Sequence, residues 1–187
     1  HVEAWESAHV EAWESAHVVA KGSAHVVAKG SAHVVAANYV SVHRFGTNTT
    51  VIGGVQIQVP EIRTAEQWCE WYDVVVSAGV ATVFKAVDDQ WISSRGFRYL
   101  PGTQPKAPDW DGGQAECGGG LHFAATEALA LAFKVTATHL MACPVRVSDI
   151  VVHWPADFPM KIKTAQVCAP IWECDRNGKR KGKSTND

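Results

Sequence analysis

Four residues in the C-terminal half of the chain have side chains that bind transition metals. Cys117 and His122 flank a Gly-Gly-Gly-Leu run, while Cys143 and Cys168 lie in stretches that read as strands. Thiolate and imidazole are the ligands that structural zinc prefers, so these four residues are the zinc candidates. The Cys-x4-His spacing is looser than a paired zinc knuckle and no second Cys-x2-Cys accompanies it. The alternative is therefore that the cysteines are plain core residues.

The segment from Cys117 to Phe123 can be read in two further ways. A thiol close to an imidazole is the pairing that nucleophilic catalysis needs, and Cys117 with His122 offers it. A glycine-rich run can also bind phosphate, but this one precedes a strand and not a helix. We therefore expect the glycines to serve a turn or a close backbone approach. Four aspartates show no glycosidase-like spacing: Asp88, Asp89, Asp109 and Asp111.

Residues 61–175 supply the elements that must position these side chains. Thr64 followed by Gln67 is a capping box, and Trp68, Trp71 and Tyr72 recur at helical spacing, so a short helix with a buried aromatic face is predicted. The other predicted elements are the strands VATVFKAVD, GLHF, HLMACPVRV, DIVVHW and MKIKTAQVCAPIWEC, and the helix ATEALALAF. Strands and helices without regular alternation predict a small α+β domain, followed by a basic flexible tail at residues 176–187.

The first 40 residues are built from an eight-residue repeat, HVEAWESA in two copies and HVVAKGSA in the next two. Period-2 alternation places small apolar residues such as Val10 and Ala12 on one strand face and His, Glu, Trp or Lys on the other. Glu14-Ser15 and Gly22-Ser23 have the chemistry of corners. Each octad therefore predicts one strand and one corner, and stacked octads predict a β-helix or β-solenoid stem over residues 1–60.

Two geometries fit these octads. In a single-chain solenoid, two or three octads form each coil, so five octads give about two coils. In an intertwined trimer, the Ala and Val faces of three chains meet at an axis. Stacking in register predicts His over His, Trp5 near Trp13 and Lys21 near Lys29, with residues near 50–60 capping the stem. We expect the histidines to stack, with metal binding as the alternative.

The octad resembles the V-x-G-x-x-x-x-x repeat of the triple-stranded β-helices in phage tail needles and spikes, with Val10-x-Ala12 in place of Val-x-Gly. The second half of the chain also resembles a small uncharacterised domain of actinobacterial and phage proteins, which has no established activity. The resemblance lies in three stretches, Phe84–Asp88, Gly96–Gly102 and Cys117–Phe123. The order of elements in this half is remotely similar to ADP-ribosyltransferase toxins. That likeness implies NAD as the cofactor and makes Lys85, Asp88, His122 and Glu173 the catalytic candidates. Lys85 stands in the place of an arginine there, and Glu173 is a loose match for the terminal glutamate.

Bulk composition narrows the function classes. A net charge of -2 argues against nucleic acid as a partner, and no apolar run is long enough for a membrane span. Five cysteines, an odd number, predict free thiols. Because the chain begins in frame with a repeat and without Met, we expect a piece of a longer protein.

We therefore expect a structural and interaction protein without a cofactor: a self-associating, homo-oligomeric stem of a fibre, tail or surface appendage that displays the C-terminal domain. A trimer is the oligomer that the intertwined geometry implies. A virion or cell-surface appendage is the expected location and the cytoplasm the alternative. One alternative, which we favour less, is an ADP-ribosyltransferase-like enzyme or toxin domain on the stem. Another alternative is a monomeric solenoid adaptor.

Overall fold

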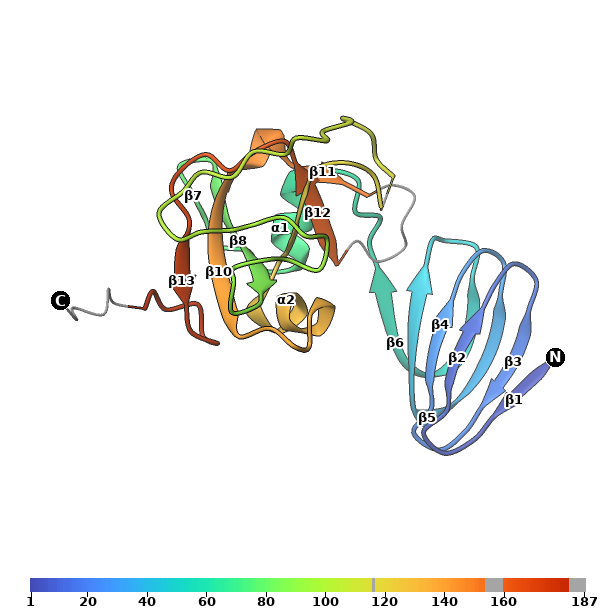
Figure 1. Cartoon of the computed structure of the whole chain (residues 1–187). Helices are drawn as coiled ribbons and strands as arrows, with labels where there is room; N and C mark the ends of the chain where they lie inside the picture. Colours follow the sequence, from blue (N-terminus) through green and yellow to red (C-terminus); the bar gives the residue numbers. More distant parts are fainter. Residues whose placement is uncertain (116, 154–159, 182–187) are drawn as a thin grey trace. The chain divides into compact units, whose positions relative to one another are not determined.

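The computed structural model describes residues 1–115, 117–153 and 160–181. The chain divides into two compact units, residues 1–61 and residues 62–187, each of which is described by itself (Figure 1). Within the described residues the fold is mostly β, with a solenoid in the first unit and two α-helices in the second.

The octads form short parallel strands that stack on one another. The strands of the first unit are β1 (Val2–Ala4), β2 (His9–Ala12), β3 (His17–Ala20), β4 (His25–Ala28), β5 (His33–Phe45) and β6 (Thr50–Val59). Val2 pairs with Val18 and Val18 with Val34, so one coil takes two octads, one for each side of the solenoid. On the other side, His9 pairs with His25, and the end of β5 continues the stack.

The solenoid has about four turns, not the two expected from the octads alone. β5 and β6 each run along both sides and supply the third and fourth coils, because β6 pairs in parallel with β5 from Thr50 to Val59. The stretch expected to act as a cap is therefore itself a coil. A single chain closes each coil with its own strands, as the single-chain geometry predicts.

The inward face of the solenoid is small and apolar, which confirms the alternation expected for the octads. Its buried residues are Ala4, Ala12, Val18, Ala20, Ala24, Val26, Ala28, Ala32, Val34, Ala36, Val40 and Val42. Because only Ala and Val point inward, opposite sides of each coil can approach closely and exclude water.

The corners stack as tightly as the strands. Glu6 and Gly22 occupy the same corner in successive coils, and both have positive φ, 56° and 71°. A Cβ built on Gly22 would lie 2.8 Å from the Cα and the nitrogen of Glu6, so the second coil requires glycine there. The corner expected at Gly22-Ser23 is confirmed.

Ladders of side chains run along the outside of the coils. The histidines stack as expected, with ring centroids 4.9 Å apart for His9 and His25 and 5.0 Å apart for His17 and His33. The expected tryptophan and lysine pairs are wrong. Two octads per coil place Lys21 over the ring of Trp5, at 4.2 Å, and Lys29 over the ring of Trp13, at 3.8 Å. Both octads of the first coil carry tryptophan at this position and both octads of the second coil carry lysine, so the two residue types form cation–π pairs between the coils.

The second unit contains a seven-stranded sheet over its described residues, in the order β11-β12-β9-β8-β10-β13 with β7 beside β8. The strands are β7 (Val76–Ser77), β8 (Val80–Val87), β9 (Leu121–Ala124), β10 (His139–Arg146), β11 (Val151–Val152), β12 (Lys161–Thr164) and β13 (Trp172–Cys174). The helices are α1 (Ala65–Trp71) and α2 (Glu127–Phe133), with a 3-10 turn η1 (Val147–Asp149).

The two helices pack on opposite faces of this sheet (Figure 1). Trp68 of α1 joins the core that contains Val83 and Met141, while Ala130 of α2 joins the one that contains Phe84 and Leu140. The capping box is present, since the hydroxyl of Thr64 accepts the N–H of Gln67 and the Gln67 side chain accepts the N–H of Thr64. The expected burial of Trp71 is wrong, because this side chain is 37% exposed.

Two remaining expectations concern the membrane and the tail. In the described part of the chain, neither helix is long and apolar enough to cross a bilayer. Asp175 accepts the N–H groups of Asn177 and Lys179, and Lys181 donates to Glu173, so residues 176–181 fold back on β13. Residues 182–187 of the predicted flexible tail lie outside the described residues.

Candidate functional site

The sheet of the second unit nearly splits between two of its central strands. β8 pairs with β10 at eight positions and β9 pairs with β12 along all four of its residues. Between β8 and β9, over the described strands, one residue pair joins the two halves, Phe84 with Ala124. Beyond this pair, β8 and β9 do not pair with each other, and the two strands diverge.

A pocket of about 170 Å³ lies at this split. Its lining residues come from β8, β9, the start of β12, α2 and loops. Its lining residues are Phe84, Lys85, Ala86, Ser94, Arg95, Cys117, His122, Phe123, Ala124, Ala130, Phe133, Lys134 and Lys161. A second hollow of about 320 Å³ shares Lys85, Arg95 and His122 with it. Both therefore meet at the same three side chains.

Lys85 bridges the gap between the diverging strands. Its Nζ donates to the backbone carbonyl of His122 on β9 at 2.9 Å and lies 5.5 Å from the ring centre of Tyr99. Burial, with the nearby charges of Arg95, Lys161 and Lys134, lowers the pKa of Lys85 to about 8. Of the described residues, none contributes a carboxylate within ion-pair distance of this amine.

Arg95 holds the rim of the pocket through backbone oxygens. Its guanidinium donates to the carbonyl of Cys117 at 2.7 Å and to that of Gly118 at 3.0 Å. Charge-assisted bonds of this kind fix the loop and leave the positive charge beside the pocket.

The glycine run of this loop permits close packing, as expected from the sequence. A Cβ on Gly119 would lie 1.7 Å from the carbonyl oxygen of Asp109. Asp111 fixes the loop by accepting the N–H of Gly119 at 2.7 Å and the amine of the fully buried Lys163 at 2.6 Å. The bond from Lys163, with those from two glycine N–H groups, lowers the pKa of Asp111 to about 2.

His122 is a neutral imidazole at physiological pH. Burial, followed by the charges of Arg95 and Lys85, lowers its pKa to about 4. Nδ1 lies 3.1 Å from the carbonyl of Gly120 and 3.5 Å from the guanidinium of Arg95, and the ring stacks on His153 with the ring centres 5.7 Å apart.

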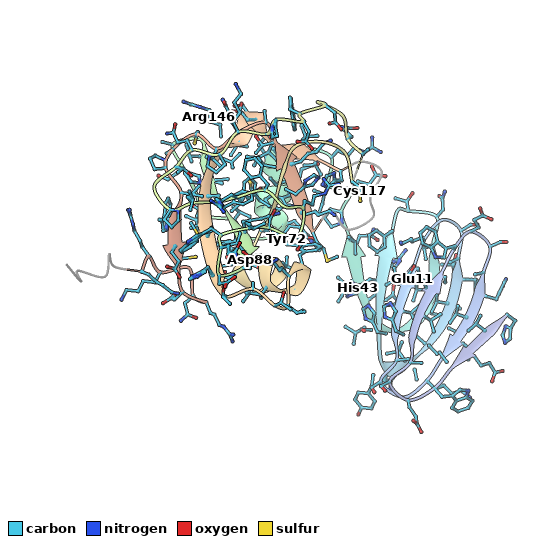
Figure 2. The ribbon with its side chains drawn as sticks, in the orientation of Figure 1. Glu11, His43, Tyr72, Asp88, Cys117 and Arg146 are labelled. Atoms are coloured by element: carbon cyan, nitrogen blue, oxygen red, sulfur yellow. The ribbon has the colours of Figure 1, made fainter. Side chains whose placement is uncertain are left out.

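The other two catalytic candidates do not line this pocket. Asp88, at the end of β8 (labelled in Figure 2), accepts N–H groups from Ile92 and Gln90 and lies 3.4 Å from Lys134; these bonds lower its pKa. Glu173 lies on β13, with β10 between it and the strand of Lys85.

Glu173 is held by its own partners. Its carboxylate lies 3.0 Å from Nδ1 of His139 and 2.5 Å from the amine of Lys181. Burial raises the pKa of Glu173, but these two bonds outweigh it and bring the pKa below its ordinary value. Glu173 therefore sits in an ion-pair network at the sheet edge.

The four zinc candidates lie on separate elements. Cys117 (labelled in Figure 2) is exposed and lines the pocket, Cys143 is fully buried in β10, and Cys168 donates to the carbonyl of Pro144. Burial raises the pKa of Cys143 well above its ordinary value. In the described part of the chain, no three His, Cys, Asp or Glu residues form a group able to hold a metal. All five cysteines are free thiols, as expected.

Sequence reasoning missed three cationic residues of the pocket: Arg95, Lys134 and Lys161. Arg95 directly precedes the Gly96–Gly102 stretch, and that adjacency was the one available signal. Lys134 and Lys161 look like ordinary solvated lysines in the sequence. Together with Lys85 they give the pocket four basic side chains, and its described lining residues include no carboxylate. A pocket with this lining can bind an anionic ligand whose apolar part contacts Phe84 and Phe133.

Comparisons with protein families, with curated proteins and with solved structures find no match for this chain.

Proposed function

We propose that the chain is a structural protein, the solenoid stem of a fibre, tail or surface appendage that displays the second unit. The observation that carries this proposal is the stacking of the coils in register, with an Ala and Val interior and cation–π and histidine ladders outside. A structure that repeats along one direction adds length by adding coils, and this is the property that a stem needs.

Self-association of the stem would bury an apolar row on its outer surface. Val19 pairs with Val35 and Val35 with Ile52 across three successive coils. Val35 is 40% exposed and Ile52 is 56% exposed. Rows of exposed β-branched residues on stacked strands favour association, because burying them releases water.

Light scattering coupled to size-exclusion chromatography tests this association on the full chain. We expect a mass that is a multiple of 20.2 kDa, and we expect Val35→Lys with Ile52→Lys to shift the equilibrium to the monomer. Tyr39→Lys is the matched control, since Tyr39 is exposed but lies outside the row. A monomer at every concentration would favour the adaptor role instead.

A second candidate function is an NAD-dependent transferase in the second unit. It is supported by one observation, namely that Lys85 and His122 line one cationic pocket where a sheet splits. Calorimetric titration with NAD, followed by a nicotinamide-release assay, tests it. Binding and turnover that are lost in Lys85→Ala but kept in Lys106→Ala would support the transferase. The absence of both from the unmodified chain would eliminate it.

A further inference from the structure

The amine of Lys85 differs from the paired lysines of the second unit. Lys134, Lys163 and Lys181 each lie within ion-pair distance of a carboxylate. Lys85 instead donates to one backbone carbonyl and lines both hollows at the split. One N–H is used in that bond, so the nitrogen lone pair of the neutral amine stays available.

The charges around Lys85 favour the neutral amine. Burial is the main cause that lowers its pKa to about 8; the charges of Arg95, Lys161 and Lys134 act in the same direction, and Cys143 acts in the opposite direction. At pH 7 about a tenth of such an amine is neutral, roughly 300 times the neutral fraction of a lysine with the ordinary pKa of about 10.5. A partly desolvated lysine among other cations is a recognised way to make a nucleophile.

We infer that Lys85 forms a reversible imine with a small aldehyde or ketone that carries a phosphate or carboxylate group. The lone pair of Nζ attacks the carbonyl carbon, the two protons of the neutral amine pass to the carbonyl oxygen, and the C–O bond breaks to release one water molecule as the C=N bond of the imine forms. Arg95 and Lys161 bind the anionic group, and the aromatic rings of Phe84 and Phe133 contact the rest of the ligand. This site does not depend on whether the domain uses NAD.

Reductive trapping of the full chain tests the inference. Pyridoxal 5′-phosphate is the probe, sodium borohydride reduces the imine to a stable secondary amine, and peptide mass spectrometry reads the labelled lysines. We expect Lys85 to be labelled about tenfold or more faster than the exposed Lys106 at pH 7.5. The rate at Lys85 should rise through pH 8, following its neutral fraction.

Two comparisons separate a built site from general lysine labelling. Pyridoxal, which lacks the phosphate, should label Lys85 several-fold more slowly than the phosphorylated probe, and inorganic phosphate should slow the phosphorylated probe at Lys85 but not at Lys106. Lys161→Gln should remove this phosphate preference, whereas Lys106→Gln should leave it unchanged. Equal labelling of Lys85 and Lys106, or a rate at Lys85 that rises only near pH 10, would overturn the inference.

Discussion

The lowered pKa of Lys85 predicts that this residue destabilises the second unit at neutral pH. The unfolded chain has the ordinary lysine pKa of about 10.5 and the folded chain a pKa of about 8. At about 1.4 kcal/mol per tenfold, keeping this amine protonated in the fold costs at most about 3.5 kcal/mol. Because the side chain is partly exposed and keeps one hydrogen bond, we expect Lys85→Met to raise the free energy of unfolding by about 1–3 kcal/mol at pH 7.

The pH dependence of this gain has a definite sign. Above about pH 10.5 the amine is neutral in both states, so the variant gains nothing from removing the charge. Between about pH 10.5 and 8 the unfolded chain binds the proton more tightly, and the folded chain loses stability as the pH falls. Below about pH 8 both states are protonated, and the full cost is present.

Urea unfolding of both proteins between pH 7 and 11 measures the difference. Pulsed alkylation of the fully buried Cys143 reports opening of the second unit alone, without a contribution from the solenoid. Other titrating groups are common to both proteins and cancel. A stability difference that stays constant from pH 8 to 10.5 would refute the assignment of a lowered pKa to Lys85.

Gly22→Ala should destabilise the solenoid by about 2–4 kcal/mol, measured by amide hydrogen exchange, because the added methyl group would clash with the backbone of Glu6. Gly46→Ala is the control: Gly46 also has a positive φ but has open space around it, so this change should cost only about 1 kcal/mol. Burial and the adjacent histidines lower the pKa of His25. Amide protection of the solenoid should therefore be full above pH 6.5 and decrease as the pH falls below 6.5. The decrease should be smaller in His25→Asn. Asp111→Asn should lower the urea midpoint of the second unit, and adding Lys163→Met should restore most of it; no restoration would contradict the pairing.

The strands of the solenoid were predictable because their signal is local. Alternation of Val and Ala with larger residues defines an inward and an outward face within a single octad. The number of octads per coil was not predictable, since a repeat of eight residues is compatible with any whole number of them. The pairing of Val2 with Val18 shows that one coil takes two octads, and this number places Lys21 over Trp5.

The later coils escaped prediction for a related reason. Val34 and Val42 keep their inward positions, but the outward and corner residues of β5 and β6 no longer follow the octad. Burial constrains only the inward positions, so the repeat loses its outward consensus while the coil persists. In the fourth coil, Gly53 fits under the carbonyl oxygen of Ala36, where a Cβ would lie 2.2 Å away.

The candidate site shows the limit of sequence reasoning more sharply. Lys85 was selected from a resemblance, and His122 both from that resemblance and from its spacing to Cys117. Both line one pocket, but Arg95 and Lys161 join them where β8 and β9 diverge after one residue pair. No local pattern encodes that divergence, which depends on how β9 pairs with β12 at its other edge.

The position of Lys85 on β8 explains how the split persists. Where a continuous ladder would place backbone bonds between β8 and β9, the Lys85 side chain supplies a longer connection to the carbonyl of His122. An apolar residue in place of Lys85 would leave the carbonyl of His122 unpaired, which costs stability, but it would also remove a desolvated charge, which gains stability. The expected net gain of about 1–3 kcal/mol for Lys85→Met means that removing the charge has the larger effect. Stability alone therefore does not account for a lysine at this position, whereas an amine that faces a cationic pocket and stays partly neutral at pH 7 has a chemical use.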